Sequence, residues 1–322
     1  MRNIGCFPAT TEAANVPMVL HEPGILARYR PINQPWRYYF CSLFQLHNET
    51  VNVWTHLIGT VVLWTVLENY SDRYDIWNSN RPLLIFGVCA MTNNLCSSVV
   101  HLVHSKSPTV HYHAILIDYI GVAVYSFGTG IMTFYSNSDR QLYDILQNYY
   151  MPFLVVVTWI NFTCVSTAKV VCGEDPYSIK RKVLQVGSMS LQAVLVILPF
   201  APRYWHCYGN NVCSMSSLNH LTVCIVFFAL EAFFFGCHLP EKLFPGKCDI
   251  IGQGHHFFHV LVTTNQIAQL HAIVVDFEDG MSEHCQLDII TLWSCLGVLM
   301  SAILVTFIFL RQLIPKDPRK QN

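Results

Sequence analysis

The chain has 322 residues, of which 52% are hydrophobic and only 12% are charged. Average soluble domains carry about 25% charged residues, so this composition indicates an integral membrane protein. The formal net charge of -1 excludes the basic footprint of a nucleic-acid-binding protein, and no nucleic-acid partner is expected.

Charge-free windows along the chain predict membrane-spanning helices, because a bilayer core needs about 20 apolar residues per helix. One such window could be a buried helix of a large soluble protein, but a long series of them leaves no amphipathic surface. The predicted fold is therefore an all-α polytopic membrane helical bundle. Eight windows are found, at 50–67, 82–105, 119–138, 145–168, 183–202, 204–230, 250–275 and 289–310.

The flanking charges predict how these spans are oriented. The N-terminal segment, the tail and the alternate loops on their side carry fifteen Lys and Arg residues, and the opposite loops carry four. The positive-inside rule then places both termini in the cytoplasm and favours an even number of spans. The first fifty residues lack a short apolar core followed by a small-residue cleavage site, so no cleaved signal peptide is expected.

Thirteen cysteines are scattered along the chain, most of them within apolar windows, and they form no regular disulfide framework. Cys207 and Cys213 bracket a predicted outer loop. A disulfide between them and a pair of free thiols both remain open at this stage.

Ionisable side chains inside the spans cost about 2.5–3.5 kcal/mol each, so each needs a partner or a function. Taken singly, such a residue is more often a helix-end residue or a packed histidine than a ligand. The set in this chain is His101, Asp118, Glu231, His238, His255, His256, His259 and His271.

Four of these residues are predicted to lie at a similar depth in the cytoplasmic half of the membrane. His101 lies near the inner end of the second span, and Asp118 lies at the inner end of the third. His255 and His259 lie at the start of the seventh span with i,i+4 spacing, which projects both rings from one helix face. Three imidazoles with an open fourth position are typical of a catalytic zinc site. The sequence therefore predicts Zn²⁺ at His101, Asp118, His255 and His259.

Other residues near this depth are further candidates. Ser97 lies one turn before His101 and could bond a metal-bound water or a substrate carbonyl, or bond back to its own helix. His256 could replace His255 as a ligand, although its ring should point about 100° away. Glu231 could lie near the pocket or simply pair with His238. The candidates for lining a pocket are Glu231, His256 and Gln266.

Three motifs in this order resemble the progestin and adipoQ receptor family, over about Pro31 to Asp276. They are the run Asn48 to His56 (NETVNVWTH), the S-x-x-x-H of Ser97 to His101 followed by Asp118, and the H-x-x-x-H of His255 to His259. The resemblance implies a cytoplasmic segment at 1–49 and a seven-helix core, similar to haemolysin III, at 50–276. An outer loop, an eighth span and a basic tail would follow at 277–322.

Within that family, the run Leu239 to Gly246 (LPEKLFPG) and the run Gly252 to His255 (GQGH) look most like the membrane progestin receptors of the alpha and beta types. One departure is His256, where glutamine would be expected. This branch implies a steroid (progestin) receptor in the plasma membrane, with endomembranes as a further location. It would lie among membrane lipids and signal rapidly through G proteins.

The family's metal site also resembles that of alkaline ceramidases, which implies an alternative function as a zinc-dependent amidohydrolase acting on ceramide or another sphingolipid. His101, His255 and His259 would hold the zinc. Asp118 would orient or deprotonate a water molecule, and Ser97 would steady the carbonyl oxygen. Ion transport ranks lower, because the discontinuous helices typical of transporters are not evident.

Overall fold

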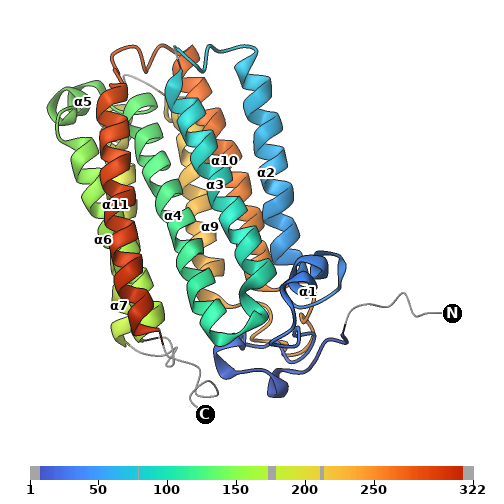
Figure 1. Cartoon of the computed structure of the whole chain (residues 1–322). Coiled ribbons are helices and arrows are strands. Elements are labelled where there is room, and N and C mark those ends of the chain that lie inside the picture. Colours follow the sequence, from blue (N-terminus) through green and yellow to red (C-terminus); the bar gives the residue numbers. More distant parts are fainter. Residues whose placement is uncertain (1–7, 79, 173–178, 211–213, 315–322) are drawn as a thin grey trace.

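The computed structural model describes residues 8–78, 80–172, 179–210 and 214–314, and these form a bundle of helices (Figure 1). Within the described ranges there is no β-strand, apart from an isolated antiparallel bridge between Thr11 and Tyr29. Three short helices, α1 (Trp36–Cys41), α5 (Arg140–Leu146) and α8 (Ala201–Asn210), lie at the ends of the bundle. The long helices are α2 (Thr50–Ser71), α3 (Arg81–Val103), α4 (Pro108–Ser136), α6 (Tyr150–Val171), α7 (Ile179–Ile197), α9 (Asn219–Cys237), α10 (Gly254–Glu278) and α11 (Ile289–Leu313).

Six of these helices are long and apolar enough to cross a membrane, namely α2, α3, α4, α6, α9 and α11. Helices α7 and α8 meet at a 59° bend and would together make a seventh span. Helix α10 is as long as α11 but is more polar, and it packs against α9, α2 and α3. The protein is thus an integral multi-pass membrane protein, and the predicted all-α polytopic bundle is confirmed.

Several predicted windows differ from the helices observed, and two of the differences are large. Helix α4 begins at Pro108, eleven residues before the predicted 119, because Ser107 caps it by accepting a hydrogen bond from the Val110 N–H at 3.2 Å. The predicted continuous span 204–230 is wrong: α8 ends at Asn210 and α9 begins only at Asn219. Hydropathy alone marks where a helix is apolar, and it misses polar first turns and bends.

Helices α3 and α4 approach closely because small residues lie between them. A Cβ atom at Gly128 of α4 would lie 2.5 Å from the Cys89 Cβ of α3, and one at Gly121 would lie 2.8 Å from that of Cys96. These two glycines are seven residues apart and share one face of α4. Small residues at such positions let membrane helices pack by close van der Waals contact. The close approach brings α3, and with it His101, beside α4.

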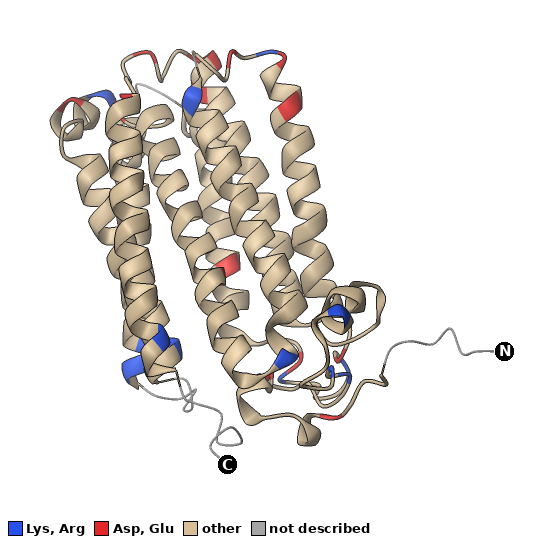
Figure 2. Ribbon diagram, viewed as in Figure 1, with Lys and Arg blue, Asp and Glu red and all other residues tan. Residues whose placement is uncertain are grey.

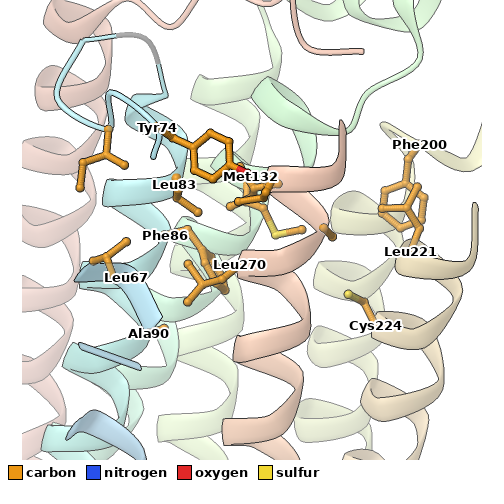
Figure 3. Close-up of a cluster of buried hydrophobic side chains, with 14 of the residues drawn as sticks. Leu67, Tyr74, Leu83, Phe86, Ala90, Met132, Phe200, Leu221, Cys224 and Leu270 are labelled. Carbon is orange, nitrogen blue, oxygen red and sulfur yellow. The ribbon is translucent and has the colours of Figure 1, made fainter. Parts of the chain in front are cut away.

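The buried apolar side chains of one half of the bundle join α2, α3, α9 and α10. Figure 3 shows Leu67, Phe86 and Leu270 at one side of this cluster and Leu221 beside Phe200 at the other. A second cluster joins α4, α6 and α11 and includes a stacked pair of rings, Phe134 and Tyr150, with centroids 4.1 Å apart. The two clusters leave the opposite end of α3 and α10 to polar side chains.

The described chain begins and ends at the same end of the bundle, and Lys and Arg gather there (Figures 1 and 2). The N-terminal segment folds against the loop between α9 and α10 at this end. The Leu26 N–H donates to the Asp249 Oδ1 at 2.9 Å, and the Gly246 N–H donates to the Gly24 carbonyl oxygen at 2.9 Å. Residues 8–49 therefore form one cap with that loop and are not a free-standing segment.

Of the two cysteines that bracket the predicted outer loop, one lies within the described residues. Cys207 is disulfide-bonded, whereas Cys213 lies outside the described residues. The pairing of these two cysteines stays a prediction.

Candidate metal centre

Three histidine rings converge where α3 ends and α10 begins. His101 comes from the last turn of α3, and His255 and His259 come from the first two turns of α10. The Nε2 atom of His255 lies 3.3 Å from that of His101 and 3.1 Å from that of His259. One ligand atom from each ring lies within 4.8 Å of the other two. The structure therefore brings together the three histidines that the spacing and depth predicted.

The second nitrogen of two of these rings shows where their protons lie. The Nδ1 of His101 lies 2.7 Å from the Glu49 Oε2, and the Nδ1 of His259 lies 3.2 Å from the Asn52 carbonyl oxygen. A carboxylate and a carbonyl only accept hydrogen bonds, so each of these Nδ1 atoms carries its proton. In a neutral ring the Nε2 is then an unprotonated lone pair.

This donor set fits a zinc ion. The Nε2 atoms of His101 and His259 both lie beside the Nε2 of His255, and facing Nε2 atoms of neutral imidazoles are ligands that one zinc ion can share. Two nitrogens bound tetrahedrally at about 2.0–2.1 Å from zinc would be about 3.3 Å apart. The measured separations of 3.1 and 3.3 Å match that value. The carboxylate behind His101 is the usual second partner of a zinc-binding histidine.

Glu49 was absent from the predicted site residues, although it occupies the centre's second layer. Its carboxylate accepts hydrogen bonds from the amide of Asn52 at 2.8 Å and the amide of Asn48 at 3.2 Å, and lies 3.5 Å from His104 Nε2. It lies just before the first apolar window, so a search limited to the spans overlooks it. A buried carboxylate one residue before a span, within a run that also holds two asparagines, is the signal that could have found it.

His256, the alternative ligand, is used differently. Its Nδ1 accepts the N–H groups of Gly252 and Gln253, each at 3.2 Å, and it completes a capping box with Gln253 at the start of α10. This ring satisfies orphan donors of the helix terminus. His255 is the member of the pair whose ring meets His101.

Asp118 and Ser97 face each other beside the histidines. The Asp118 carboxylate on α4 interacts with the Ser97 side chain on α3. Asp118 is the one acidic residue of α4. Among the described residues, the group of three histidines whose ligand atoms all lie within 4.8 Å of one another does not include Asp118. The geometry places it next to the centre, whereas the prediction made it a ligand.

A layer of polar side chains lies further along α10. Gln266 exchanges two hydrogen bonds with Asn94 of α3, at 3.0 and 3.2 Å, and Glu231 of α9 interacts with Asn265. The alternative pairing of Glu231 with His238 is therefore not what the structure shows. Buried polar groups inside a membrane bundle normally pair in this way.

At the far end of α10, Asp276 is fully buried in an ionic network. Its carboxylate accepts two hydrogen bonds from Arg203, at 2.5 and 2.9 Å, and one from Asn137 at 2.6 Å. The His220 Nε2 lies 2.9 Å from its second oxygen. One carboxylate thus ties α4, α8, α9 and α10 together.

The fold and the site define a class: a multi-pass helical membrane protein with a buried three-histidine centre at one end of its bundle. Comparison with known proteins agrees with this class. The family model for haemolysin-III-related proteins matches residues 44–270, a segment that contains Glu49 and all three histidines. Helix α11 lies beyond the matched segment.

Similar proteins cover most of the chain. Membrane progestin receptor beta of Mus musculus is 38% identical over 278 residues, which are 84% of this chain and 77% of that protein. The beta receptor of Homo sapiens is 37% identical, and the alpha receptor of Homo sapiens 35%, each with 84% of this chain and 77% of the relative covered. The chain therefore belongs to the haemolysin-III-related family, the progestin and adipoQ receptor family, and the resemblance inferred from its motifs is confirmed.

Proposed function

We propose that this protein is a progestin-type steroid receptor of the plasma membrane, with a zinc ion held by His101, His255 and His259. The observation that carries the proposal is the similarity to membrane progestin receptors over 84% of the chain. Rapid signalling through G proteins belongs to the same proposal. The histidine geometry supports the zinc ion independently of those names.

We place the steroid in an open apolar groove between α4 and α11, on the outer face of the bundle. Its volume is about 390 Å³, within the roughly 300–1,000 Å³ of small-molecule sites. A steroid is a rigid apolar body that is recognised mainly by burial. The groove is lined by Ile117, Ile120, Met300, Ser301, Ile303, Leu304 and Phe307.

Saturation binding of a labelled progestin to membranes that contain the full chain tests the receptor proposal. We expect saturable binding that other progestins compete for, and a substantially weaker affinity in Ser301→Trp, which fills the groove. Absence of saturable binding in the unaltered protein would overturn the receptor function. Normal binding in Ser301→Trp would instead place the steroid elsewhere in the bundle.

The orientation that signalling requires follows from the Lys and Arg asymmetry: both termini face the cytoplasm, and the acceptor sequence at Asn48 stays unglycosylated. An epitope at the C-terminus should therefore label only after cells are permeabilised. Labelling of intact cells would contradict this orientation.

The neighbourhood of Asp118 favours a second candidate function, hydrolysis of a ceramide-type amide. A bound zinc ion would supply Lewis acidity and activate water. Asp118 would take one proton of the water as its oxygen adds to the amide carbon, and Ser97 would donate a hydrogen bond to the carbonyl oxygen. When the C–N bond breaks, the amine would leave with the proton from Asp118, giving a sphingoid base and a fatty acid.

Asp118→Asn separates the two functions, because it keeps the size of the side chain and removes the base. A receptor should retain its steroid affinity within a few-fold, since burial dominates that affinity. Ceramide turnover should fall by a factor of roughly 100 or more, as for loss of a general base. Normal steroid binding together with simultaneous loss of ceramide turnover and of the cellular steroid response would make hydrolysis the primary function.

A further inference from the structure

We propose that Arg30 is a positioning residue for the histidine centre, and that the N-terminal segment around it clasps the two helices that carry the ligands. This inference rests on the proposed zinc site and adds the element that sets its geometry. Arg30 lies in the cap outside the spans, and it touches none of the three ligand nitrogens.

Arg30 is almost completely buried, with 1% of its surface exposed. Its guanidinium donates to the carbonyl oxygen of His101 at 2.7 Å, to that of Leu102, and to the Ser42 Oγ at 3.0 Å. No carboxylate in the described ranges lies within ion-pair distance of it. The guanidinium is therefore held by the last carbonyls of α3, and the Glu49 carboxylate favours its charge from beyond ion-pair distance.

These carbonyls belong to the turn that presents His101. The final four carbonyls of a helix lack intrahelical partners, and the negative end of the helix dipole attracts a cation. Because one planar guanidinium binds two successive carbonyls, it fixes the end of the helix in one orientation. Fraying of that turn would move the His101 ring directly.

The same segment also holds the helix that carries the other two ligands. The Gln253 Nε2, at the N-cap of α10, donates to the Asn48 carbonyl oxygen at 3.0 Å. The loop before α10 is tied to Gly24 through the Gly246 N–H at 2.9 Å. A Cβ at Gly24 would lie 2.3 Å from the Glu241 carbonyl oxygen, so segment and loop are in close contact. Residues 24–48 thus contact α3 behind His101 and α10 just before His255.

A clasp of this kind matters because coordination tolerates little displacement. The nitrogens of the centre are separated by 3.1 and 3.3 Å, close to what tetrahedral zinc requires. Changing a group that supports a ligand without touching the metal typically weakens metal affinity by about 10–100-fold. We expect the same of Arg30.

The test uses the full chain, purified and reconstituted, with zinc affinity measured by competition against a chelator. Arg30→Met should weaken zinc binding by about 10–100-fold. Co²⁺ bound in place of zinc should show altered visible absorption in this variant at saturation, a change that lower stability alone would not cause. Arg30→Lys keeps the charge but cannot span both carbonyls, so it should retain an intermediate affinity.

Arg203 supplies the matched control, since it is a buried arginine in the network at the opposite end of the bundle. Arg203→Met should lower thermal stability at least as much as Arg30→Met and leave zinc affinity within twofold. The two Lys variants provide the same comparison if a Met variant does not fold. Unaltered zinc affinity and Co²⁺ absorption in Arg30→Met would overturn the proposal for Arg30 but not the proposed zinc site. If only Arg30→Lys folds, the same result in that variant would do so. Unaltered protein that binds no zinc would overturn the metal site as well.

Discussion

The two ends of α10 carry two buried polar clusters that differ in how their hydrogen bonds are matched. At one end Asp276 is saturated: both of its oxygens receive hydrogen bonds, from Arg203, His220 and Asn137. At the other end the Nε2 atoms of His101, His255 and His259 face one another, at 3.3 and 3.1 Å. The carboxylate of the first cluster finds all its partners within the protein, whereas the facing ring nitrogens of the second cluster are where we propose the zinc ion.

This difference separates a structural cluster from a candidate site. A buried charge is tolerated when donors and acceptors are matched, and an unmatched buried acceptor is costly. Both clusters contain histidine beside a carboxylate, so residue types alone would not distinguish them. The partners of each ring and carboxylate do distinguish them, and they favour the end of α10 that carries His255 and His259 for the proposed metal.

The largest expected effect is loss of the metal on removal of one ligand. His255→Ala should abolish stoichiometric zinc binding, because two imidazoles rarely hold zinc. His256→Ala is the matched control: it removes a helix cap, lowers stability by about 1 kcal/mol, and should keep the metal. Metal analysis of the purified proteins decides this. Full zinc in the His255→Ala protein would identify His256 as the ligand, and zinc in the double variant would remove the site.

The next effect concerns the saturated cluster. Asp276→Asn leaves the buried Arg203 charge unpaired and should destabilise the protein by about 3–5 kcal/mol, as for other broken buried ion pairs. Thermal unfolding measures the loss. Zinc stoichiometry at low temperature should be unchanged, and Asp276→Leu combined with Arg203→Met should recover much of the stability. Loss of zinc in folded Asp276→Asn protein would show that the two clusters are coupled.

The smallest effect lies in the cap. Burial, reinforced by the Glu49 carboxylate, raises the pKa of Glu22 from its ordinary 4.5 to about 7. The folded state therefore keeps a proton that the unfolded chain loses first. The resulting stability is complete below pH 4.5 and is lost as pH rises toward 7. Glu22→Gln should remove this pH dependence. As the pH rises from 5 to 7, the thermal unfolding midpoint of the unaltered protein should therefore fall relative to that of the variant. Midpoints that change in parallel with pH in both proteins would contradict the raised pKa of Glu22.

The helices were predictable to different degrees, for physical reasons. The windows at 50–67 and 289–310 correspond to α2 and α11, since an apolar run must become a helix inside a bilayer. The start of α4 and the break before α9 were misjudged. Polar first turns and bends are satisfied by caps and neighbouring elements, which hydropathy does not register.

The sequence by itself determined the class of protein and its family. It also singled out the three histidines as candidates, because the cost of inserting an ionisable residue into a membrane makes each such residue conspicuous. Only the tertiary structure decided what supports them. Glu49 and Arg30 lie outside the apolar windows, Gln253 lies at the very start of one, and their partners are up to 205 residues away in the chain. The structure likewise showed that the His255 ring lies beside His101, whereas the His256 ring caps α10. Contacts between distant segments arise from packing, and no local pattern of residues encodes them.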